Sequence, residues 1–404
     1  MGKRRILVLN SGSSSLKFKL FKLPRLVPVA QGLVEDIGGP GSEGHLSWEE
    51  DGETELLEIR REIGDHAGAI GLMSELFETS GILTSLDDLA GIGHRVVHGG
   101  ERFRAPTLVD SKVLEAIREL IPLAPLHNPA NLMGIEVALD HAPSVPQVAV
   151  FDTAFHQTIP DHAYLYALPH EIYTDFHVRR YGFHGTSHGY VAKEAARQLD
   201  RPIEDLSMIT LHLGNGASAT AIKAGRSLDT SMGFTPLEGL IMGTRSGDLD
   251  PAILFYLARE HGLDLEHLDD LLNRKSGLKG ICGQSDMRAI TRQAAAGDRR
   301  AELAISMFCY RIKKYIGAYM AVLGGLDCLV FTGGIGENSQ IVRQRSCRGL
   351  EGLGIVLDEE KNKAESRLAR QIQAADSRVK ILVIPTDEEL EIAAQTIETL
   401  ECES

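Results

Sequence analysis

The chain has few cysteines, and none of them are closely paired. Disulfide frameworks and cysteine-based zinc sites depend on closely spaced pairs such as CxxC. The cysteines here are odd in number, widely separated and without any CxxC pair: Cys282, Cys309, Cys328, Cys347 and Cys402. This pattern excludes a small disulfide-stapled scaffold and disfavours a cysteine zinc site.

Long apolar runs and an excess of basic residues are also missing. No apolar run approaches the roughly 20 residues that span a bilayer. The apolar stretch at residues 6–9 is too short for a signal peptide. Lys and Arg number 42 against 56 Asp and Glu, a formal net charge of −14, whereas nucleic-acid-binding surfaces need a basic excess. We therefore expect a cytoplasmic protein that binds neither membranes nor nucleic acid.

The length and the hydrophobic pattern predict two α/β domains. A chain of 404 residues can form two sizeable cores. Apolar strands alternate with helical patterns at 111–120, 190–199, 251–261 and 302–322, which is typical of α/β architecture. We expect a domain boundary near 150–160, and a strand over 379–384 followed by a helix over 385–400 that returns to the first domain.

Two distant segments have the same design, an apolar strand, a turn of small polar residues and a second strand. They lie at 6–21 and at 208–222. Aligning Gly12 with Gly216 also aligns Ser14 with Ser218, at an offset of about half the chain. The repetition indicates an internal duplication, although two hairpins that are alike by chance remain the alternative.

Three polar turns indicate a ligand that carries phosphate. Residues 10–15, 214–218 and 332–339 each follow an apolar strand and are rich in glycine or hydroxyl groups. Such turns present backbone N–H groups and hydroxyls to phosphate, and Lys17, just after the first turn, could add a positive charge. Any one of them is more often only a turn, but three in one chain favour a phosphate-bearing ligand.

Several charged residues lie where a ligand could reach them. Arg95 and Arg245 have glycine-rich neighbourhoods, where an arginine either grips a carboxylate or phosphate or forms a structural salt bridge. Asp152 follows the apolar strand 148–151, a common position for a functional carboxylate. Residues 286–288 end a further glycine-bearing loop at 276–285.

One motif favours a different class of enzyme. Residues 185–189 fit the GxSxG nucleophile elbow, with Ser187 as the serine, and a helical pattern follows them. The preceding residues, 179–183, make a poor buried strand. A serine hydrolase is therefore an alternative, but a weaker one than a phosphate-binding enzyme.

Segments along almost the whole chain resemble the acetate kinase family, short-chain carboxylate kinases of the sugar kinase–Hsp70–actin superfamily. They occur in the family's order: NSGSSSLK (10–17), GHRVVHGGE (93–101), PLHNP (125–129), VFDTAFHQTIP (150–160), YGFHGTSHGYV (181–191), LHLGNGAS (211–218), DTSMGFTPLEGLIMGTRSGDLDP (229–251), SDMR (285–288), FTGGIGENS (331–339) and IPTDEEL (384–390). The GxSxG match lies inside the family's own YGFHGTSH segment.

The resemblance implies an α/β fold of two domains, with duplicated actin/Hsp70/sugar-kinase-like (ribonuclease H-like) cores around a nucleotide cleft. Domain I would comprise 1–155 plus 389–404, with the first phosphate turn and the arginine that anchors acetate. Domain II would comprise 156–388, with the second phosphate turn and the adenosine site. A homodimer is also implied.

The resemblance further implies the reversible reaction ATP + acetate = ADP + acetyl phosphate, by direct in-line transfer with Mg²⁺, or Mn²⁺ as a substitute. Arg95 would hold the carboxylate, and Arg245 and His184 would stabilise the transferring phosphoryl group. The family position of Asp152 is described as catalytic. Because acetate is already ionised at neutral pH, our hypothesis is that Asp152 orients Arg95 or a Mg²⁺-bound water.

The remaining site residues implied by the resemblance fall into three groups. The metal positions are Asn10 and Glu388. The pocket for the substrate's methyl group comprises Val97, Leu126, Phe183 and Pro236. The ATP-binding residues are Lys17, His212, Leu213, Gly214, Asn215, Gly216, Asp286, Met287, Arg288, Gly333, Gly334, Ile335, Gly336, Glu337 and Asn338.

Departures from the family's pattern are few. The loop 277–288 is one residue shorter than the usual form and contains Cys282, and Asp387 stands where many relatives have asparagine. Two alternatives remain within the superfamily, a propionate kinase and a non-enzymatic ATP clamp like the chaperone and actin relatives.

Overall fold

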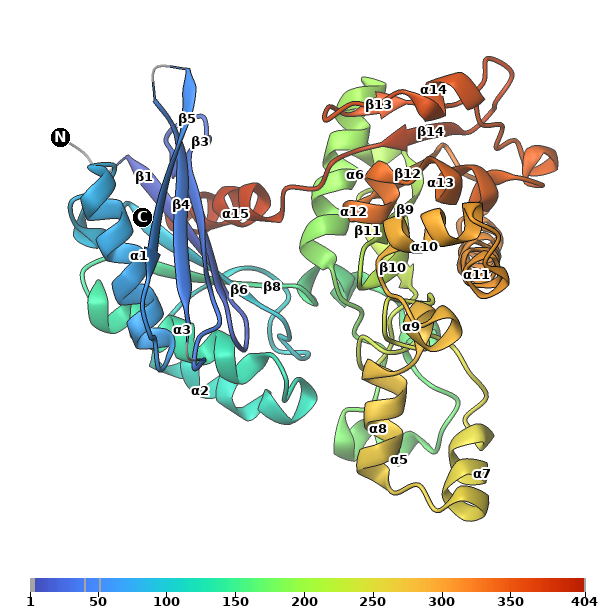
Figure 1. The fold of residues 1–404 in the computed structure, drawn as a ribbon, viewed down its shortest axis with the longest axis horizontal. Coiled ribbons are helices and arrows are strands. Elements are labelled where there is room, and N and C mark those ends of the chain that lie inside the picture. Colours follow the sequence, from blue (N-terminus) through green and yellow to red (C-terminus); the bar gives the residue numbers. More distant parts are fainter. Residues whose placement is uncertain (1–3, 40, 51, 403–404) are drawn as a thin grey trace. The chain divides into compact units, whose positions relative to one another are not determined.

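The computed structural model describes residues 4–39, 41–50 and 52–402. It divides the chain into two compact units (Figure 1), Met1–Ala154 with Asp387–Ser404, and Phe155–Thr386. The breaks lie one residue and two residues before the predicted domain boundaries at 155/156 and 388/389. In the text below, the first is the N-terminal unit and the second is the C-terminal unit.

The described part of the N-terminal unit contains a sheet of eight strands with helices on both faces. The strand order is β5-β4-β3-β2-β1-β6-β8-β7. Its strands are β1 (Arg5–Ser11), β2 (Leu16–Lys22), β3 (Val27–Glu35), β4 (Glu43–Glu50), β5 (Glu53–Arg60), β6 (Gly91–Val96), β7 (Thr107–Leu108) and β8 (Gln147–Phe151). Its helices are α1 (His66–Ser80), α2 (Ser111–Glu119), α3 (Asn128–His141) and α15 (Glu388–Cys402).

The described part of the C-terminal unit contains a sheet of six strands, in the order β11-β10-β9-β12-β14-β13. Its strands are β9 (Ser207–Leu213), β10 (Ala217–Lys223), β11 (Arg226–Thr230), β12 (Cys328–Thr332), β13 (Arg370–Gln371) and β14 (Lys380–Val383). Its helices are α4 (Asp161–Tyr164), α5 (His170–Phe176), α6 (Gly185–Leu199), α7 (Ala252–His261), α8 (Leu265–Arg274), α9 (Gly277–Cys282), α10 (Met287–Ala295), α11 (Arg299–Leu323), α12 (Gly333–Asn338), α13 (Gln340–Cys347) and α14 (Glu359–Lys363).

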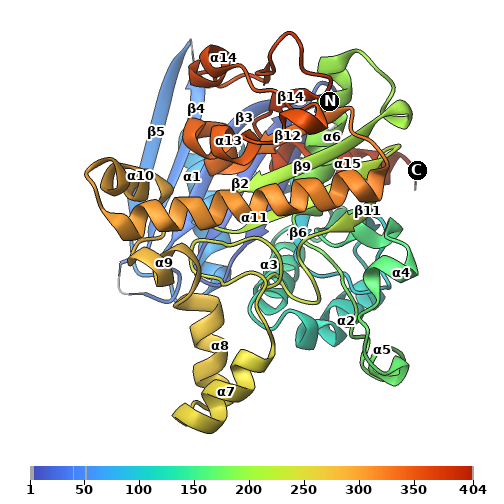
Figure 2. The same ribbon diagram turned by 90° about the vertical axis from the view of Figure 1, so that its right-hand side faces the viewer.

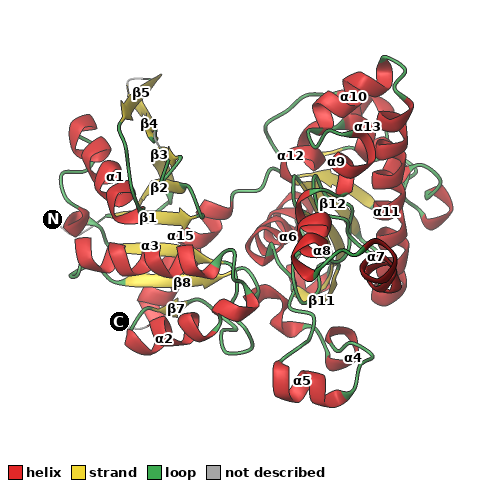
Figure 3. Cartoon of the chain, turned by 60° about the horizontal axis from the view of Figure 1, so that its bottom comes forward, coloured by secondary structure: helices red, strands yellow, loops and turns green. Residues whose placement is uncertain are grey.

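The central strands are apolar because helices cover them on both sides. In β1, Leu7 and Leu9 pack in a cluster with α1 and α3, whereas Ile6 and Val8 pack with α15 on the opposite face (Figure 3). Successive side chains of a strand point to opposite faces, so this split is the expected alternation. In the C-terminal unit, α6 packs on β9 and β12, and the long helix α11 runs across β10, β9 and β11 (Figure 2).

The predicted internal duplication is confirmed by the topology. Five strands of each sheet have the same order and sense: β3-β2-β1-β6-β8 and β11-β10-β9-β12-β14. In each set the first three strands are antiparallel neighbours and the last three are parallel neighbours. The α/β fold with two related cores is therefore confirmed.

The residue alignment predicted for the duplication is wrong, however. The first turn closes with a hydrogen bond from Gly12 N to Ser15 O, and the second with one from Gly214 N to Gly216 O. Gly12 is therefore the counterpart of Gly214, not of Gly216. Ser14 lies in its turn, whereas Ser218 is already in β10. The second turn is shorter than the first, and an alignment based only on matching glycine and serine residues did not reveal this difference in length.

In each unit, one helix that packs on the sheet follows the other unit's sheet in the chain. Helix α6 follows the N-terminal sheet in the chain but packs on β9 and β12, whereas α15 follows the C-terminal sheet but packs on β1, β6 and β8. The predicted return of the C-terminal helix to the first domain is thus confirmed, since α15 belongs to the N-terminal unit.

Two segments predicted as loops contain helices. The third polar turn, 332–339, forms α12, and the loop 276–285 includes α9. Both helices are only six residues long. Glycine-rich sequences of this length carry too little hydrophobic periodicity to reveal a helix.

Gly93 allows α15 to approach the sheet of the N-terminal unit closely. A Cβ at this position would overlap the Thr396 hydroxyl and lie 2.9 Å from Ile392 Cγ2, both on α15. We expect Gly93→Ala to destabilise the unit by about 1–3 kcal/mol because it overpacks a buried contact. Urea unfolding followed by circular dichroism would measure the change.

Gly71→Ala is the matched control. Gly71 lies inside α1 and an added Cβ would meet nothing within 4 Å, so alanine should stabilise the unit by about 0.5–1 kcal/mol through its higher helix propensity. If both variants shifted the unfolding midpoint equally, the close packing of α15 on β6 would be contradicted.

Candidate active site

In the N-terminal unit, the predicted site residues gather on the face of the sheet that α15 covers. Asn10, Lys17 and Arg95 point to this face because they alternate with residues packed on the other one. Asn10 and Lys17 are cross-strand partners on β1 and β2, and Glu388 is the first residue of α15. The strands and the helix terminus therefore present these side chains to one region.

Arg95 and Asp152 form the central ion pair of this region. Arg95 Nη2 lies 2.6 Å and Nε 3.0 Å from Asp152 Oδ2. The parallel pairing of β6 with β8 explains the contact, since Val96 pairs with Phe151 and Asp152 follows directly. Burial alone would lower the pKa of Arg95, but Asp152 and Glu388 outweigh it and raise that pKa. Arg95 is therefore a fixed, permanently charged cation.

Glu388 and Asn10 complete the surroundings of Arg95. Glu388 Oε2 lies 3.8 Å from Arg95 Nε, and Asn10 Oδ1 lies 3.5 Å from Arg95 Nη1. Burial, then Arg95 in the opposite direction, and then the carboxylates of Asp152 and Glu389 set the pKa of Glu388, which is raised to about 7. The nearby Arg95 does not fully offset burial and the neighbouring carboxylates. A bound cation would therefore stabilise the ionised form of Glu388.

The oxygen donors of Asn10 and Glu388 suit a hard divalent cation. Among the residues that the structure describes, no group of three or more His, Cys, Asp and Glu side chains is arranged to hold a metal. Mg²⁺ is commonly held by one or two protein oxygens together with substrate phosphates and water, rather than by a protein cage. An amide oxygen and one carboxylate therefore fit Mg²⁺ bound with a nucleotide.

The other predicted residues of the N-terminal unit differ in exposure. Lys17 is exposed and Val97 is buried. Leu126 is 58% exposed, so within this unit it is an open apolar surface and not part of a closed pocket.

In the C-terminal unit, His184 is held in place from several sides. It precedes α6, and its backbone has a left-handed φ of 57°. Its Nδ1 lies 2.9 Å from the Ser218 hydroxyl, and its ring stacks on that of His212 at 4.3 Å between centroids. The same hydroxyl lies 2.7 Å from His188 Nε2. The buried polar contacts orient the imidazole of His184 toward the second turn.

Gly216 brings His184 and Arg245 together at that turn. A Cβ added at Gly216 would lie 3.2 Å from Arg245 Nη2 and 3.4 Å from His184 Nε2. Arg245 Nη1 donates to the Pro236 carbonyl over 2.6 Å, and burial lowers the pKa of Arg245. Glycine thus leaves a space beside two nitrogen donors, of the kind that a phosphoryl group requires.

A cavity of about 1080 Å³ borders the same turn. Its volume is sufficient for a nucleoside. The predicted ATP-binding residues among its lining are Gly214, Asn215, Asp286, Met287, Arg288, Gly334, Ile335 and Asn338.

The far wall of the cavity was missed by sequence reasoning. It includes residues of α10, α13 and α14 and their flanks: Ser285, Thr291, Ser339, Gln340, Ile341, Gln344, Glu359, Asn362 and Lys363. These residues belong to ordinary polar helix faces without a glycine-rich turn, so no local signal in the sequence marks them.

Other residues predicted to bind ATP do not line the cavity. Gly333 and Gly336 are buried, and Glu337 turns its carboxylate back to accept from Gly333 N at 3.0 Å and Thr386 N at 3.2 Å. His212, Leu213 and Gly216 lie on β9 and at the turn beside the lining residues. Glu337 therefore supports the fold of α12 in this structure.

The serine hydrolase interpretation is contradicted by the position of Ser187. Its side chain is fully buried, and its hydroxyl lies 2.8 Å from both His212 Nδ1 and the Thr386 hydroxyl. A nucleophile elbow needs an exposed serine after a strand, whereas residues 179–183 form no strand. Ser187 instead supports His212.

Comparisons with known proteins show which family the chain belongs to. A family model described as the Acetokinase family matches residues 5–394. The chain belongs to this family. It is therefore an enzyme, a kinase, and the predicted family resemblance is confirmed.

Individual members of the family cover nearly the whole chain. The acetate kinase of Syntrophobacter fumaroxidans is 56% identical over 398 residues, which cover 98% of this chain and 97% of that protein. The crystal structure of Porphyromonas gingivalis acetate kinase is 45% identical, has a TM-score of 0.93 and covers 98% of this chain and 100% of its own. A propionate kinase from Francisella tularensis is 42% identical with a TM-score of 0.91 and the same coverages.

Buried His188 should make the C-terminal unit sensitive to acid. Burial, and then His156 and His212, hold the pKa of His188 well below 6.5. The unfolded chain therefore binds a proton below about pH 6.5 that the folded chain does not, and stability falls as the pH falls. We expect a slope of up to about 1.4 kcal/mol per pH unit from this group. Hydrogen exchange of β9 amides between pH 7 and pH 5 would measure it.

His188→Gln should reduce that slope, although it also loses stability at pH 7 because its contacts with Thr210 and Ser218 change. The control is His170→Gln, at an exposed position on α5, which should keep the wild-type slope. An unchanged slope in His188→Gln would contradict a neutral, buried imidazole.

Proposed function

We propose that the chain is an ATP:acetate phosphotransferase, which catalyses ATP + acetate = ADP + acetyl phosphate in both directions by in-line transfer. The observation that carries the proposal is the meeting of Arg245 and His184 at Gly216, on a turn that also borders a nucleoside-sized cavity. Relatives named acetate kinase at 50–56% identity support the choice of acetate.

Electrostatics accounts for most of the proposed chemistry. Acetate is already an anion at neutral pH, so it needs no general base. The barrier comes from bringing two anions together in line, and catalysis is positioning plus charge stabilisation. Arg95 holds the acetate carboxylate, and Arg245 and His184 stabilise the transferring phosphoryl group. An arginine in the latter role is worth about 10³–10⁵ in rate in other phosphoryl-transfer enzymes.

Asp152 acts by positioning Arg95. Two nitrogens of Arg95 contact one Asp152 oxygen at 2.6 and 3.0 Å, and the carboxylate itself is 1% exposed. A group so enclosed and so engaged is poorly placed to accept a proton from substrate. The contacts favour this role over that of orienting a metal-bound water.

ATP or ADP and a divalent metal ion are the expected partners of acetate or acetyl phosphate in this family. Asn10 and Glu388 would hold Mg²⁺, or Mn²⁺ in its place. When bound, the ion supplies charge neutralisation at the phosphate oxygens. Lys17 would add a further positive charge to the phosphates.

The remaining proposed roles concern the nucleoside and the methyl group of acetate. The cavity residues on the second turn, on α10 and on α12 hold the nucleoside and its phosphates. Val97 and Leu126 of the N-terminal unit and Phe183 and Pro236 of the C-terminal unit would contact the methyl group of acetate. Phe183 is buried and Val97 is 9% exposed. One extra methylene is worth only about 1–3 kcal/mol in such a pocket, so we expect slow turnover of propionate beside acetate.

We also propose that the protein is a cytoplasmic homodimer. Helix α7 is apolar in sequence, yet it buries no residue in its own chain, and Ile253, Phe255 and Tyr256 are 45%, 59% and 58% exposed. A second copy of the chain would cover these residues. Within the described residues, no helix is long and apolar enough to cross a membrane.

Arg95→Ala should greatly reduce the formation of acetyl phosphate. A hydroxamate assay with ATP and Mg²⁺ would detect acyl phosphate from acetate, propionate and butyrate. We expect the wild type to turn over acetate faster than propionate or butyrate. In Arg95→Ala, kcat/KM for acetate should fall at least about 10³-fold, because the substrate loses its charged anchor. No acyl phosphate from any acid, with ATP still bound, would refute the kinase proposal.

Arg95→Lys and Asp152→Asn sharpen this test. Lysine keeps the charge but cannot make the two-nitrogen contact, so it should recover only part of the activity. Asp152→Asn should raise KM for acetate, and the double variant Arg95→Ala/Asp152→Asn should lose no more than Arg95→Ala alone. Additive losses would mean that Asp152 acts independently of Arg95.

Phe255→Glu should convert the dimer to a monomer, because two charged side chains would face each other across the proposed contact. Size-exclusion chromatography with light scattering measures the mass directly. Leu56→Glu, at a 58% exposed position on β5, is the control and should leave the mass unchanged. A wild-type monomer would refute the proposal outright.

A further inference from the structure

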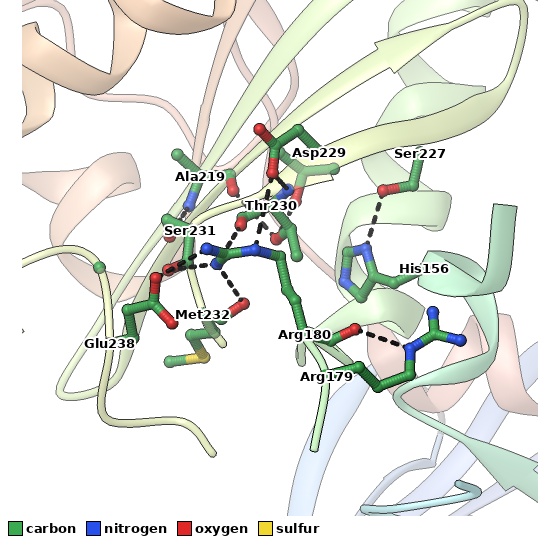
Figure 4. A network of polar contacts seen from close by, with 12 residues as sticks. His156, Arg179, Arg180, Ala219, Ser227, Asp229, Thr230, Ser231, Met232 and Glu238 are labelled. Carbon is green, nitrogen blue, oxygen red and sulfur yellow. Dashed lines mark hydrogen bonds and ion pairs between the residues drawn. The ribbon is translucent and has the colours of Figure 1, made fainter. Parts of the chain in front are cut away.

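A network of polar contacts centred on Arg180 joins the end of β11 to the loop that follows it (Figure 4). Arg180 Nη1 donates to three successive carbonyls, those of Thr230 at 2.9 Å, Ser231 at 3.3 Å and Met232 at 3.0 Å. Its Nη2 donates to Glu238 Oε1 over 2.7 Å. One guanidinium therefore fixes the end of β11 and reaches across to the following loop.

Tyr166 holds the same loop from the other oxygen of Glu238. Its hydroxyl donates to Glu238 Oε2 and accepts from Phe234 N at 2.9 Å. Gly233 makes room for this arrangement, since a Cβ there would overlap both the carboxylate and the hydroxyl. The segment from Phe234 to Glu238 is thus fixed at both ends by Tyr166 and Arg180.

Arg245 is attached to the middle of this fixed segment. Its Nη1 donates to the carbonyl of Pro236, which lies between Phe234 and Glu238, over 2.6 Å. The base of its loop is closed by hydrogen bonds from Gly239 N to Asp248 Oδ1 at 2.7 Å and from Asp248 N to Gly239 O at 3.0 Å. The direction of the Arg245 guanidinium therefore depends on where Glu238 and Tyr166 hold the Pro236 carbonyl.

The network also reaches the segment of His184. Tyr181 N and Gly182 N both donate to Gly233 O, at 3.1 and 3.3 Å. Arg180 directly precedes these residues in the chain, and His184 follows them. The two proposed phosphoryl-stabilising side chains are consequently attached to one polar framework.

The largely buried charge of Arg180 is compensated by two nearby carboxylates, those of Glu238 and Asp229. Arg180 and Glu238 have side chains that are 16% and 33% exposed, and Asp229 Oδ1 lies 3.9 Å from Arg180 Nε. An arginine removed from water needs an anionic or carbonyl partner for each of its donors. Removing the Glu238 charge would leave that cation under-compensated and free the loop.

We propose that Glu238, Arg180 and Tyr166 are positioning residues, which set the orientation of Arg245 toward the transferring phosphoryl group. They act through the Pro236 carbonyl and do not touch the substrate. The inference rests on the proposed function, because it assigns these residues to the same reaction.

Glu238→Gln tests the proposal most directly, because the amide keeps the shape of the carboxylate and removes its charge. We expect kcat for acetyl phosphate formation to fall about 10- to 100-fold, as a misplacement of about 1 Å can cost 10²-fold. KM for ATP should stay within about twofold, since the cavity lining is untouched. Tyr166→Phe, which removes a single hydroxyl, should lower kcat in the same direction and serves if Glu238→Gln folds poorly.

A double-variant comparison separates positioning from general stability. In an Arg245→Ala background, Glu238→Gln should change kcat by less than about twofold, because its effect passes through Arg245. Glu302→Gln is the matched control: Glu302 is likewise hydrogen-bonded to an arginine, here through two nitrogens of Arg345, but on α11 and α13. It should keep wild-type kcat.

Two results would overturn the inference. One is a Glu238→Gln variant with wild-type kcat and only a lowered melting temperature. The other is the same fold loss of kcat in the presence and absence of Arg245. A wild-type protein that forms no acetyl phosphate would refute the proposed function itself, and the two failures are therefore distinguishable.

Discussion

The structure depends on keeping arginine side chains charged and oriented while most of their surface is removed from water. Each buried guanidinium must have its donors satisfied, or the cost of burial exceeds any gain. The chain does this in two ways. Arg95 is paired with the carboxylate of Asp152, whereas Arg343 donates to the carbonyls of Gly336, Glu337 and Asn362. Pairing with a carboxylate, as in Arg95, gives a pair with no net charge. Donation to carbonyls, as in Arg343, satisfies the donors but leaves the positive charge in place.

That difference matters in a protein with a net charge of −14. Positive potential for two anionic substrates cannot come from the overall charge, so it has to be local. Arg245 donates to a carbonyl, that of Pro236, and its charge is therefore still available to a phosphoryl group. Arg180, and not Arg245, forms the ion pair with the Glu238 carboxylate. In this part of the C-terminal unit, the Glu238 carboxylate therefore compensates the charge of Arg180 and leaves that of Arg245 available.

The internal duplication places candidate site residues of the two units at equivalent positions of their hairpins. In the hairpins, the pair Asn10–Lys17 occupies the same place as the pair His212–Ser218, one step before the turn. Both pairs face the helix that packs on the sheet, α15 in one unit and α6 in the other. One geometric position therefore carries candidate metal and phosphate ligands in one half, and the support of His184 in the other.

Much of this arrangement could be predicted from the sequence, because strands and polar turns leave strong local signals. The polar turn that begins at Asn10 and the glycine-rich surroundings of Arg95 and Arg245 already mark the segments that carry the candidate site. The registration of the two repeats could not be predicted, since it depends on a difference in turn length that glycine and serine letters hide. The same limit applies to the far wall of the cavity, where Gln344 and Glu359 lie on helices with no distinguishing motif.

The Arg180 network shows why some functional residues leave no local signal at all. Several of its partners are backbone carbonyls, which every residue has, and the carboxylate that accepts from Arg180, that of Glu238, lies 58 positions away. A motif records side chains that touch the substrate, but the orientation of those side chains is set by contacts between segments. The orientation of Arg245 depends on its hydrogen bond to the Pro236 carbonyl. The residues that hold this carbonyl in place can be recognised only in the folded structure.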